Sequence, residues 1–122
     1  MIIEIDFNSE EAIYVQLCNQ IILGIATARL QEGDSLPSVR QLADEIGINM
    51  HTVNKAYTVL KQEGIIRLDR RRGAVIAIDM DKLQALEDMK RQLMVVLAKG
   101  RCKNITKEEV YELVDEIFEE YR

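Results

Sequence analysis

Apolar side chains recur every three or four residues in five stretches of this chain, a spacing that predicts amphipathic helices. The expected helices cover residues 9–30, 38–46, 49–63, 80–99 and 106–121. Residues 1–8 alternate apolar and acidic side chains, and we expect them to form an extended arm that packs on the body. Two β-prone runs, 65–69 and 74–78, flank a short connection that contains a glycine, which predicts a hairpin.

Polar residues and glycines stand where these helices are expected to begin and end. Ser38 and Gln41 have the three-residue spacing of a capping box, in which a first turn satisfies its own free amides, and the segment that begins at Thr106 repeats this spacing. Asn49 and Ser9 are expected to cap two further helices. Helix ends are expected at the glycines Gly47, Gly64 and Gly100.

The two short helices over residues 38–63 are joined by a tight connection, which favours a helix-turn-helix over a parallel bundle. Pro37, the only proline of the chain, stops any helix that arrives from upstream. The second helix of the pair would be the recognition helix, the one that enters the major groove of DNA. The hairpin that follows would then be a wing.

Three consecutive arginines stand at the tip of this hairpin, Arg70, Arg71 and Arg72. They repel one another and have little structural use there, whereas the phosphates of a nucleic acid would hold them. Seen alone, the run is equally well interpreted as a solvated charged turn. Its position directly after a helix-turn-helix favours a wing that contacts DNA.

The formal net charge of the whole chain, −5, at first argues against a nucleic-acid partner. The charges are unevenly distributed, however. Residues 35–78 carry seven bases and four acids, a net charge of +3, whereas residues 79–122 carry eleven acids and eight bases, a net charge of −3. DNA is attracted by the local charge of a protein surface and not by the net charge of the chain. The net-basic segment 35–78 therefore remains a candidate for binding DNA.

Size and composition place limits on the other functions. A chain of 122 residues with 48% hydrophobic residues is expected to fold as one compact domain, or as one small domain with an appendage. No membrane span or signal peptide is evident, so we expect a cytoplasmic protein with no membrane partner. Cys18, Cys102 and a single histidine suggest neither a disulfide nor a metal site. No cofactor motif, nucleophile–base pair or phosphate loop is present, so no catalytic residue is assigned and an enzyme is not expected.

The last two predicted helices are strongly apolar on one side and need something to cover them. Packing on the protein's own body is one interpretation. A symmetric dimer interface is the favoured one, because two-fold symmetric proteins read two half-sites on DNA. The expected interface consists of Leu86, Met89, Leu93, Val96, Val110, Leu113, Val114, Ile117, Phe118 and Tyr121.

Several ordered motifs of this chain resemble the GntR family of bacterial transcription regulators. They are Ile13-Tyr14-Val15-Gln16-Leu17, Gly33-Asp34-Ser35-Leu36-Pro37-Ser38-Val39-Arg40, Leu42-Ala43, Thr52-Val53, Lys55-Ala56-Tyr57, Leu60, Glu63-Gly64-Ile65-Ile66 and Gly73. The tail of about 45 residues resembles the YtrA-type subfamily, in which two helices replace larger ligand-binding domains. The resemblance implies a mainly α fold with a small β wing, with a winged helix-turn-helix DNA-binding domain over residues 1–78 and an antiparallel two-helix dimerisation region over 79–122.

The resemblance also implies which residues contact DNA. They lie at the start of each helix of the pair and in the wing. The expected set is Ser38, Arg40, Asn49, Met50, His51, Thr52, Asn54, Lys55, Arg70, Arg71, Arg72 and Gly73. Many family members have Arg where Met50 and Asn54 stand here, and the wing usually has an extra glycine where Arg71 stands.

Two functions follow from these predictions. The first is a sequence-specific DNA-binding transcriptional regulator, a repressor that acts as a homodimer on a palindromic operator in double-stranded DNA. The alternative is a winged-helix protein–protein interaction module whose basic wing binds an acidic partner. The polar first turn of the predicted recognition helix favours DNA, since a protein-binding face is more often apolar. No small-molecule effector is identified by the sequence.

Overall fold

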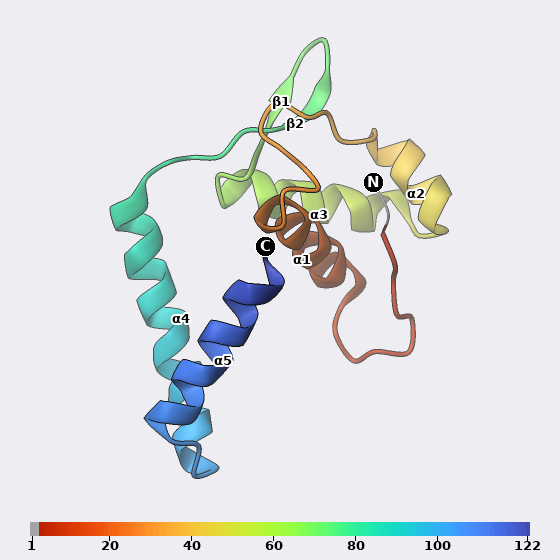
Figure 1. Ribbon diagram of the computed structural model, residues 1–122. Coiled ribbons are helices and arrows are strands. Elements are labelled where there is room, and N and C mark those ends of the chain that lie inside the picture. Colours follow the sequence, from red (N-terminus) through yellow and green to blue (C-terminus); the bar gives the residue numbers. More distant parts are fainter. Residues whose placement is uncertain (1–2) are drawn as a thin grey trace. The chain divides into compact units, whose positions relative to one another are not determined.

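The computed structural model describes residues 3–122, which form five α-helices and one two-stranded antiparallel sheet (Figure 1). The mainly helical class with a small β element is therefore confirmed. The chain divides into two compact units, one that ends at Asp79 and one that spans Met80–Arg122. We call them the N-terminal unit and the C-terminal unit. Of the helices that the structure describes, none has the length and apolar character needed to cross a membrane.

The N-terminal unit holds the only extensive core among the described residues. Its elements in chain order are α1 (Ile13–Ala26), α2 (Val39–Ile46), α3 (Met50–Gln62), β1 (Ile66–Asp69) and β2 (Gly73–Ile76). Helices α1 and α2 and strand β1 all pack against α3, which makes α3 the centre of this unit (Figure 1). The largest fully buried side chains of this unit are Leu17, Ile21, Leu42, Val53, Leu60, Val75 and Ile76.

Local capping explains the boundaries of α2 and α3, as predicted. The Ser38 hydroxyl accepts a hydrogen bond from the Gln41 amide at 3.1 Å, and the Gln41 side chain accepts one from the Ser38 amide at the same distance. Asn49 Oδ1 accepts from the His51 amide at 2.7 Å. Gly47 and Gly64 follow the two helices in left-handed backbone, with φ of 80° and 73°. These conformations favour glycine, so both predicted helix ends are confirmed.

Helix α1 is shorter than predicted. It begins at Ile13 and not at Ser9, because the Ser9 hydroxyl accepts from the Glu11 amide within a turn that precedes the helix. It ends at Ala26 and not near Leu30. Beyond it the chain turns back through Ala28, which has a φ of 61°, and the Leu30 amide donates to the Gly24 carbonyl at 3.0 Å.

Gly24 permits this return. A Cβ at Gly24 would lie 3.0 Å from Leu30 Cδ1, so the glycine is a close-packing point, as its position inside a helix suggested.

The segment before α1 is held on that helix by hydrogen bonds. The Glu4 amide donates to Gln20 Oε1 at 2.8 Å and the Asp6 amide to Gln16 Oε1 at 2.9 Å. The predicted arm thus packs along α1 as far as Asp6, whereas Phe7 is 61% exposed, and residues 1 and 2 lie outside the described residues.

The sheet has a contribution that the pattern did not predict. Strands β1 and β2 pair in the register Ile66↔Ile76 to Asp69↔Gly73, and each is slightly shorter than its predicted run. The segment before Pro37 adds a third antiparallel contact, with Ser35 bridged to Val75. The Leu36 amide donates to the Ala74 carbonyl at 2.8 Å. The hairpin is therefore anchored on its second strand by residues that lie almost forty positions earlier.

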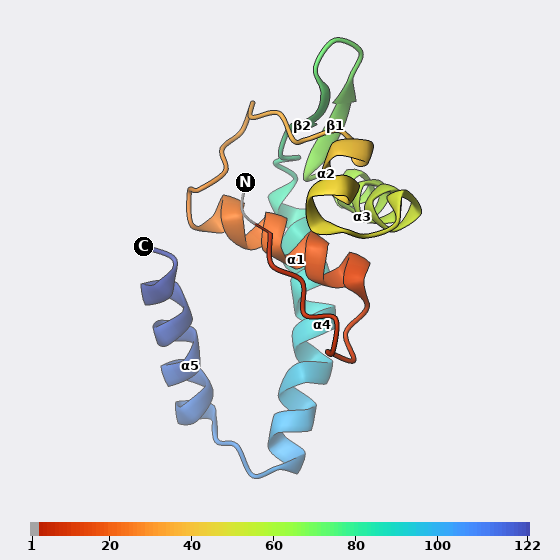
Figure 2. The same cartoon turned by 90° about the vertical axis from the view of Figure 1, so that its right-hand side faces the viewer.

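The C-terminal unit contains α4 (Lys82–Cys102) and α5 (Lys107–Glu120), which are joined at one end and run in opposite directions (Figure 2). The Thr106 capping box of α5 is confirmed, with the Thr106 hydroxyl accepting from the Glu109 amide at 3.1 Å. The prediction that Gly100 ends α4 is wrong. The helix continues to Cys102, and Asn104 supplies the left-handed turn, with φ 62°, while the Gly100 carbonyl accepts from the Ile105 amide.

Candidate nucleic-acid interface

Helix α3 has one buried side and one polar, exposed side. Val53, Ala56, Tyr57 and Leu60 are buried, at the spacing expected for the core side of a helix. The opposite side begins at the N-cap, Asn49, and all the predicted DNA-contact residues of α3 are exposed except Thr52, which is half-buried. The polar side therefore presents amide, imidazole and ammonium groups at the amino end of the helix, where free backbone N–H groups also attract anions.

A buried hydroxyl fixes α3 relative to the start of α2. The Tyr57 hydroxyl donates to the Pro37 carbonyl at 2.7 Å. Burial raises the pKa of this phenol, and the charge of Glu45 adds to the effect, so it stays protonated and keeps donating. The neighbouring residues Ser38 and Arg40 are exposed. This hydrogen bond ties the middle of α3 to the residue before the cap of α2, and the starts of these two helices supply eight of the predicted contacts.

The wing tip is held by its own acidic residue. Asp69 Oδ1 accepts from the Arg71 amide at 2.8 Å and from the Arg72 amide at 3.1 Å. These two hydrogen bonds lower the pKa of the Asp69 carboxyl below its usual range, because they favour the charged form. The hairpin extends away from the helices of its unit in both views (Figure 1 and Figure 2).

The three wing arginines are not equivalent. The Arg72 guanidinium donates to the Gly33 carbonyl and so ties the tip to the segment that pairs with β2. The side chains of Arg70 and Arg71 are exposed. Arg67 on β1 is a further exposed base, which the sequence prediction did not include. Strand alternation was the available signal for Arg67, because it follows the buried Ile66 and therefore faces outward.

Lys55 lies against α1. Its ammonium group is 4.1 Å from the centroid of the Tyr14 ring, within the range of a cation–π contact. The resemblance to the family placed Lys55 among the expected DNA contacts. In the structure its ammonium group lies over an aromatic ring, and its contact with DNA stays a prediction.

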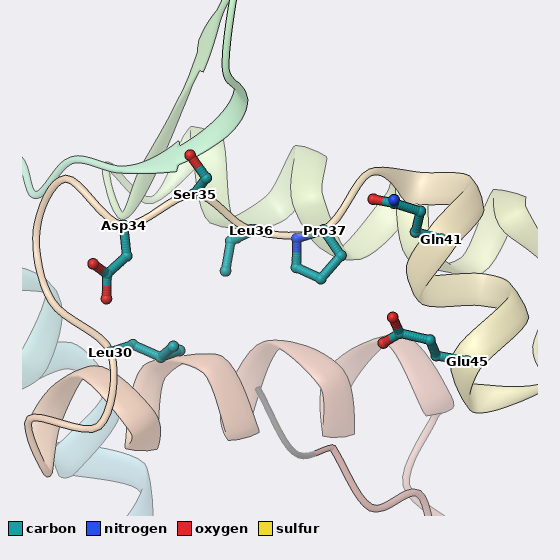
Figure 3. A pocket seen from close by; sticks show the side chains of 7 residues that line it. All are labelled: Leu30, Asp34, Ser35, Leu36, Pro37, Gln41 and Glu45. Carbon is teal, nitrogen blue, oxygen red and sulfur yellow. The ribbon is translucent and has the colours of Figure 1, made fainter.

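The N-terminal unit also has a shallow, open hollow of about 440 Å³ beside α2 (Figure 3). Its polar groups serve local turns, since Asp34 accepts from the Gln31 amide and Gln41 from the Ser38 amide. The carboxylates of Asp34 and Glu45 would repel phosphate, so the hollow is not part of the candidate interface. The lining residues are Leu30, Asp34, Ser35, Leu36, Pro37, Gln41 and Glu45.

Cys18 lies in the buried core and not on this surface. Cys18 is 6% exposed, and its thiol donates to the Ala56 carbonyl at 3.4 Å. Burial raises the pKa of this thiol to about 11, and the charge of Glu63 acts in the same direction, so the thiol is unreactive. Over residues 3–122, no group of three or more His, Cys, Asp or Glu side chains is placed to hold a metal ion.

Residues 10–76, which include α1, the helix pair and the wing, match the family described as bacterial regulatory proteins, gntR family. The chain belongs to the GntR family. It is a transcriptional regulator with a DNA-binding winged helix, and the regulators of this family are not enzymes. The match spans more than half of the chain and contains every residue of the candidate interface.

Relatives of similar length extend the match to the tail of this GntR regulator. The HTH-type transcriptional repressor YtrA of Bacillus subtilis is 35% identical over 119 residues, which cover 94% of this chain and 91% of that protein. YtrA from Sulfolobus acidocaldarius, a GntR-family transcription factor, is 37% identical with a TM-score of 0.61 and covers 97% of each chain. A transcriptional antiterminator from Listeria monocytogenes has a TM-score of 0.87 at 29% identity, over 99% of this chain and 92% of that one.

Proposed function

We propose that this GntR regulator is a homodimeric repressor that binds a palindromic operator, with α3 of each subunit reading one half-site. The observation that carries the proposal is the exposed, polar amino end of α3, in the same unit as an exposed basic wing. The repressor assignment is supported by the similarity to the Bacillus subtilis repressor YtrA over most of both chains.

Sequence recognition is assigned to the first turns of α3. The side-chain amides of Asn49 and Asn54 can pair with the adenine edge in the major groove. Met50, which is 42% exposed although it is apolar, suits contact with a thymine methyl group. An apolar side chain among polar neighbours at this position favours base contact over phosphate contact.

Affinity is assigned to the basic groups around α3. Arg40 at the start of α2 and the exposed wing residues Arg70 and Arg71 are suited to bind phosphate on both sides of the recognition helix. Arg72 is engaged by the Gly33 carbonyl, so we assign it mainly to the shape of the wing. Each phosphate contact releases counterions, so binding should weaken steeply as salt rises.

Dimerisation is assigned to the C-terminal unit. Among its described side chains none is fully buried, and large apolar groups such as Leu93 and Ile117 remain 42% and 43% exposed. Two amphipathic helices with an uncovered apolar side are not stable alone in water, and a second copy would bury them symmetrically. The proposed interface is the predicted set from Leu86 to Tyr121, of which only Val110 and Tyr121 are half-buried in the single chain.

The test is selection of bound duplexes from a random-sequence pool, followed by salt titration on the selected sequence and on a scrambled one. We expect an enriched inverted repeat and a steep loss of affinity with salt. Enrichment of a single unrepeated motif would argue against the homodimer. Equal binding to selected and scrambled duplexes would refute sequence-specific recognition.

A further inference from the structure

The chain leaves the N-terminal unit against the end of the recognition helix. After β2 it passes beside the turn that closes α3, where the Ala77 amide donates to the Ile65 carbonyl at 3.0 Å. The Asp79 amide then donates to the Gly64 carbonyl at 2.7 Å. We call this pair of contacts the exit clasp. It links the last residue of the N-terminal unit directly to the residue that terminates the recognition helix.

Gly64 is needed at the clasp for two reasons. Its φ of 73° is a conformation that side-chain-bearing residues rarely adopt. In addition, a Cβ at this position would lie 2.7 Å from Asp79 Cβ, closer than real Cβ atoms approach. Any other residue at 64 therefore has to displace Asp79, so the glycine is what lets the exit segment lie flush against the end of α3.

The tether between the clasp and α4 is very short. Asp81 already belongs to the start of α4, since its side chain accepts from the Gln84 amide at 3.1 Å and its carbonyl from the Ala85 amide at 3.1 Å. Only Met80 lies between Asp79 in the clasp and Asp81 at the cap. Because each residue contributes two soft backbone dihedrals, few rotations separate the recognition helix from the C-terminal unit.

We propose that the exit clasp, with Gly64 as its positioning residue, determines which half-site spacing the dimer accepts. The inference rests on the proposed homodimeric function. If the C-terminal units form the two-fold interface, the clasp and the one-residue tether limit how far each α3 can move relative to that interface. One added base pair moves a half-site by roughly 3.4 Å and rotates it by about 34°. While the clasp holds α3, the helix cannot follow a half-site that has moved in this way. An α3 that is released from the clasp can follow it.

Gly47 provides a matched control for the test. Like Gly64 it terminates a helix with positive φ, here 80°, but no described atom beyond its chain neighbours lies within 4 Å of a Cβ built on it. Gly47→Ala and Gly64→Ala therefore share the backbone strain, and only Gly64→Ala pushes Asp79 away. A second test variant, with two glycines inserted between Asp79 and Met80, lengthens the tether and leaves both helix ends unchanged.

The experiment measures affinity of each full-length variant for duplexes whose two half-sites are separated by the preferred spacing or by one or two base pairs more or less. A duplex with one half-site reports on the integrity of α3. For the wild type and Gly47→Ala we expect about a tenfold loss for one base pair of misplacement. For Gly64→Ala and for the insertion we expect less than about a threefold loss, because the recognition helices become independently mobile.

Two results overturn the inference, and they differ from each other. The first result is a sharp spacing preference, like that of the wild type, in the insertion variant and in Gly64→Ala. Gly64→Ala is counted only if it still binds the single half-site. In that case the clasp does not determine spacing. The insertion decides the outcome even where Gly64→Ala does not fold. If the wild type binds one half-site as tightly as two, the homodimeric function fails first, and the inference fails with it.

Discussion

The two units of this regulator differ in how completely their apolar side chains are buried. In the N-terminal unit Leu17 and Leu60 are completely buried, while in the C-terminal unit Leu86 and Leu113 are 52% and 50% exposed. Both units contain well-capped helices, so local helix formation does not explain the difference. The N-terminal unit has helices and strands to close its core. Two helices without a third layer cannot do so, which is why the proposed dimer interface is assigned to the C-terminal unit.

The largest expected effect tests whether the N-terminal core carries the stability of the molecule. Leu60→Ala removes a fully buried side chain from α3 and should lower the free energy of unfolding by about 2–5 kcal/mol. Leu93→Ala removes the same atoms from a side chain that is 42% exposed within one chain. Urea unfolding, followed by circular dichroism at low protein concentration, should show a markedly smaller loss for Leu93→Ala. Equal losses would mean that the C-terminal unit has a core of its own.

The next effect concerns the uncovered side of α5. Leu113→Glu combined with Ile117→Glu places two charges in the proposed interface, and should raise the dimer dissociation constant by at least about a hundredfold. Sedimentation velocity measures the change. Glu116→Lys alters charge on a more polar position of the same helix and should leave the dimer intact. An unchanged dimer in the double variant would move the interface away from α5.

A smaller effect distinguishes two roles of Asn49 at the start of α3, namely capping the helix and contacting a base. Asn49→Ser keeps a good N-cap but removes the side-chain amide, so it should cost roughly 1–3 kcal/mol of operator binding with little change in stability. Asn49→Ala should lose both functions. Fluorescence anisotropy with operator and scrambled duplexes, together with thermal unfolding, distinguishes them. If Asn49→Ser binds operator like the wild type, Asn49 serves the helix and not the DNA.

The smallest effect concerns the wing. Arg71→Ala should weaken binding to all duplexes about equally and reduce the magnitude of the salt slope by roughly 0.9, as expected for one lost phosphate contact. Arg72→Ala should change the salt slope less, because its guanidinium already donates to the Gly33 carbonyl. Salt titrations of the two variants on scrambled DNA make the comparison. A larger slope change for Arg72→Ala would reverse the two roles.

Most features that depend on neighbouring residues were predicted, although Ser9 does not cap α1 and Gly100 does not end α4. The capping boxes at Ser38 and Thr106, the cap at Asn49 and the glycine ends at Gly47 and Gly64 all rest on contacts within a few positions. The hairpin likewise follows from two short runs and a glycine. Membership of the GntR family was evident from ordered motifs, since these specify the spacing of core and turn residues over the whole winged helix.

Two helix ends and the contact of Lys55 were not predicted. The early end of α1 requires Leu30 to fold back on Gly24, and the continuation of α4 past Gly100 requires Asn104 to make the turn. Both turns are local, but the capping signals did not show which residue would adopt a positive φ. The contact of Lys55 with Tyr14 was not predicted for a different reason, since the ring lies on another helix.

The sequence by itself thus determined the five helices, their main caps, the hairpin and the family, because capping and periodicity act over three or four residues. Only the tertiary structure decided that the segment before Pro37 anchors the wing, that Arg72 is tied to Gly33, and that Asp79 rests on Gly64. Those contacts join residues between 15 and 40 positions apart. Their formation depends on how the core brings the backbone together, which local propensity does not encode.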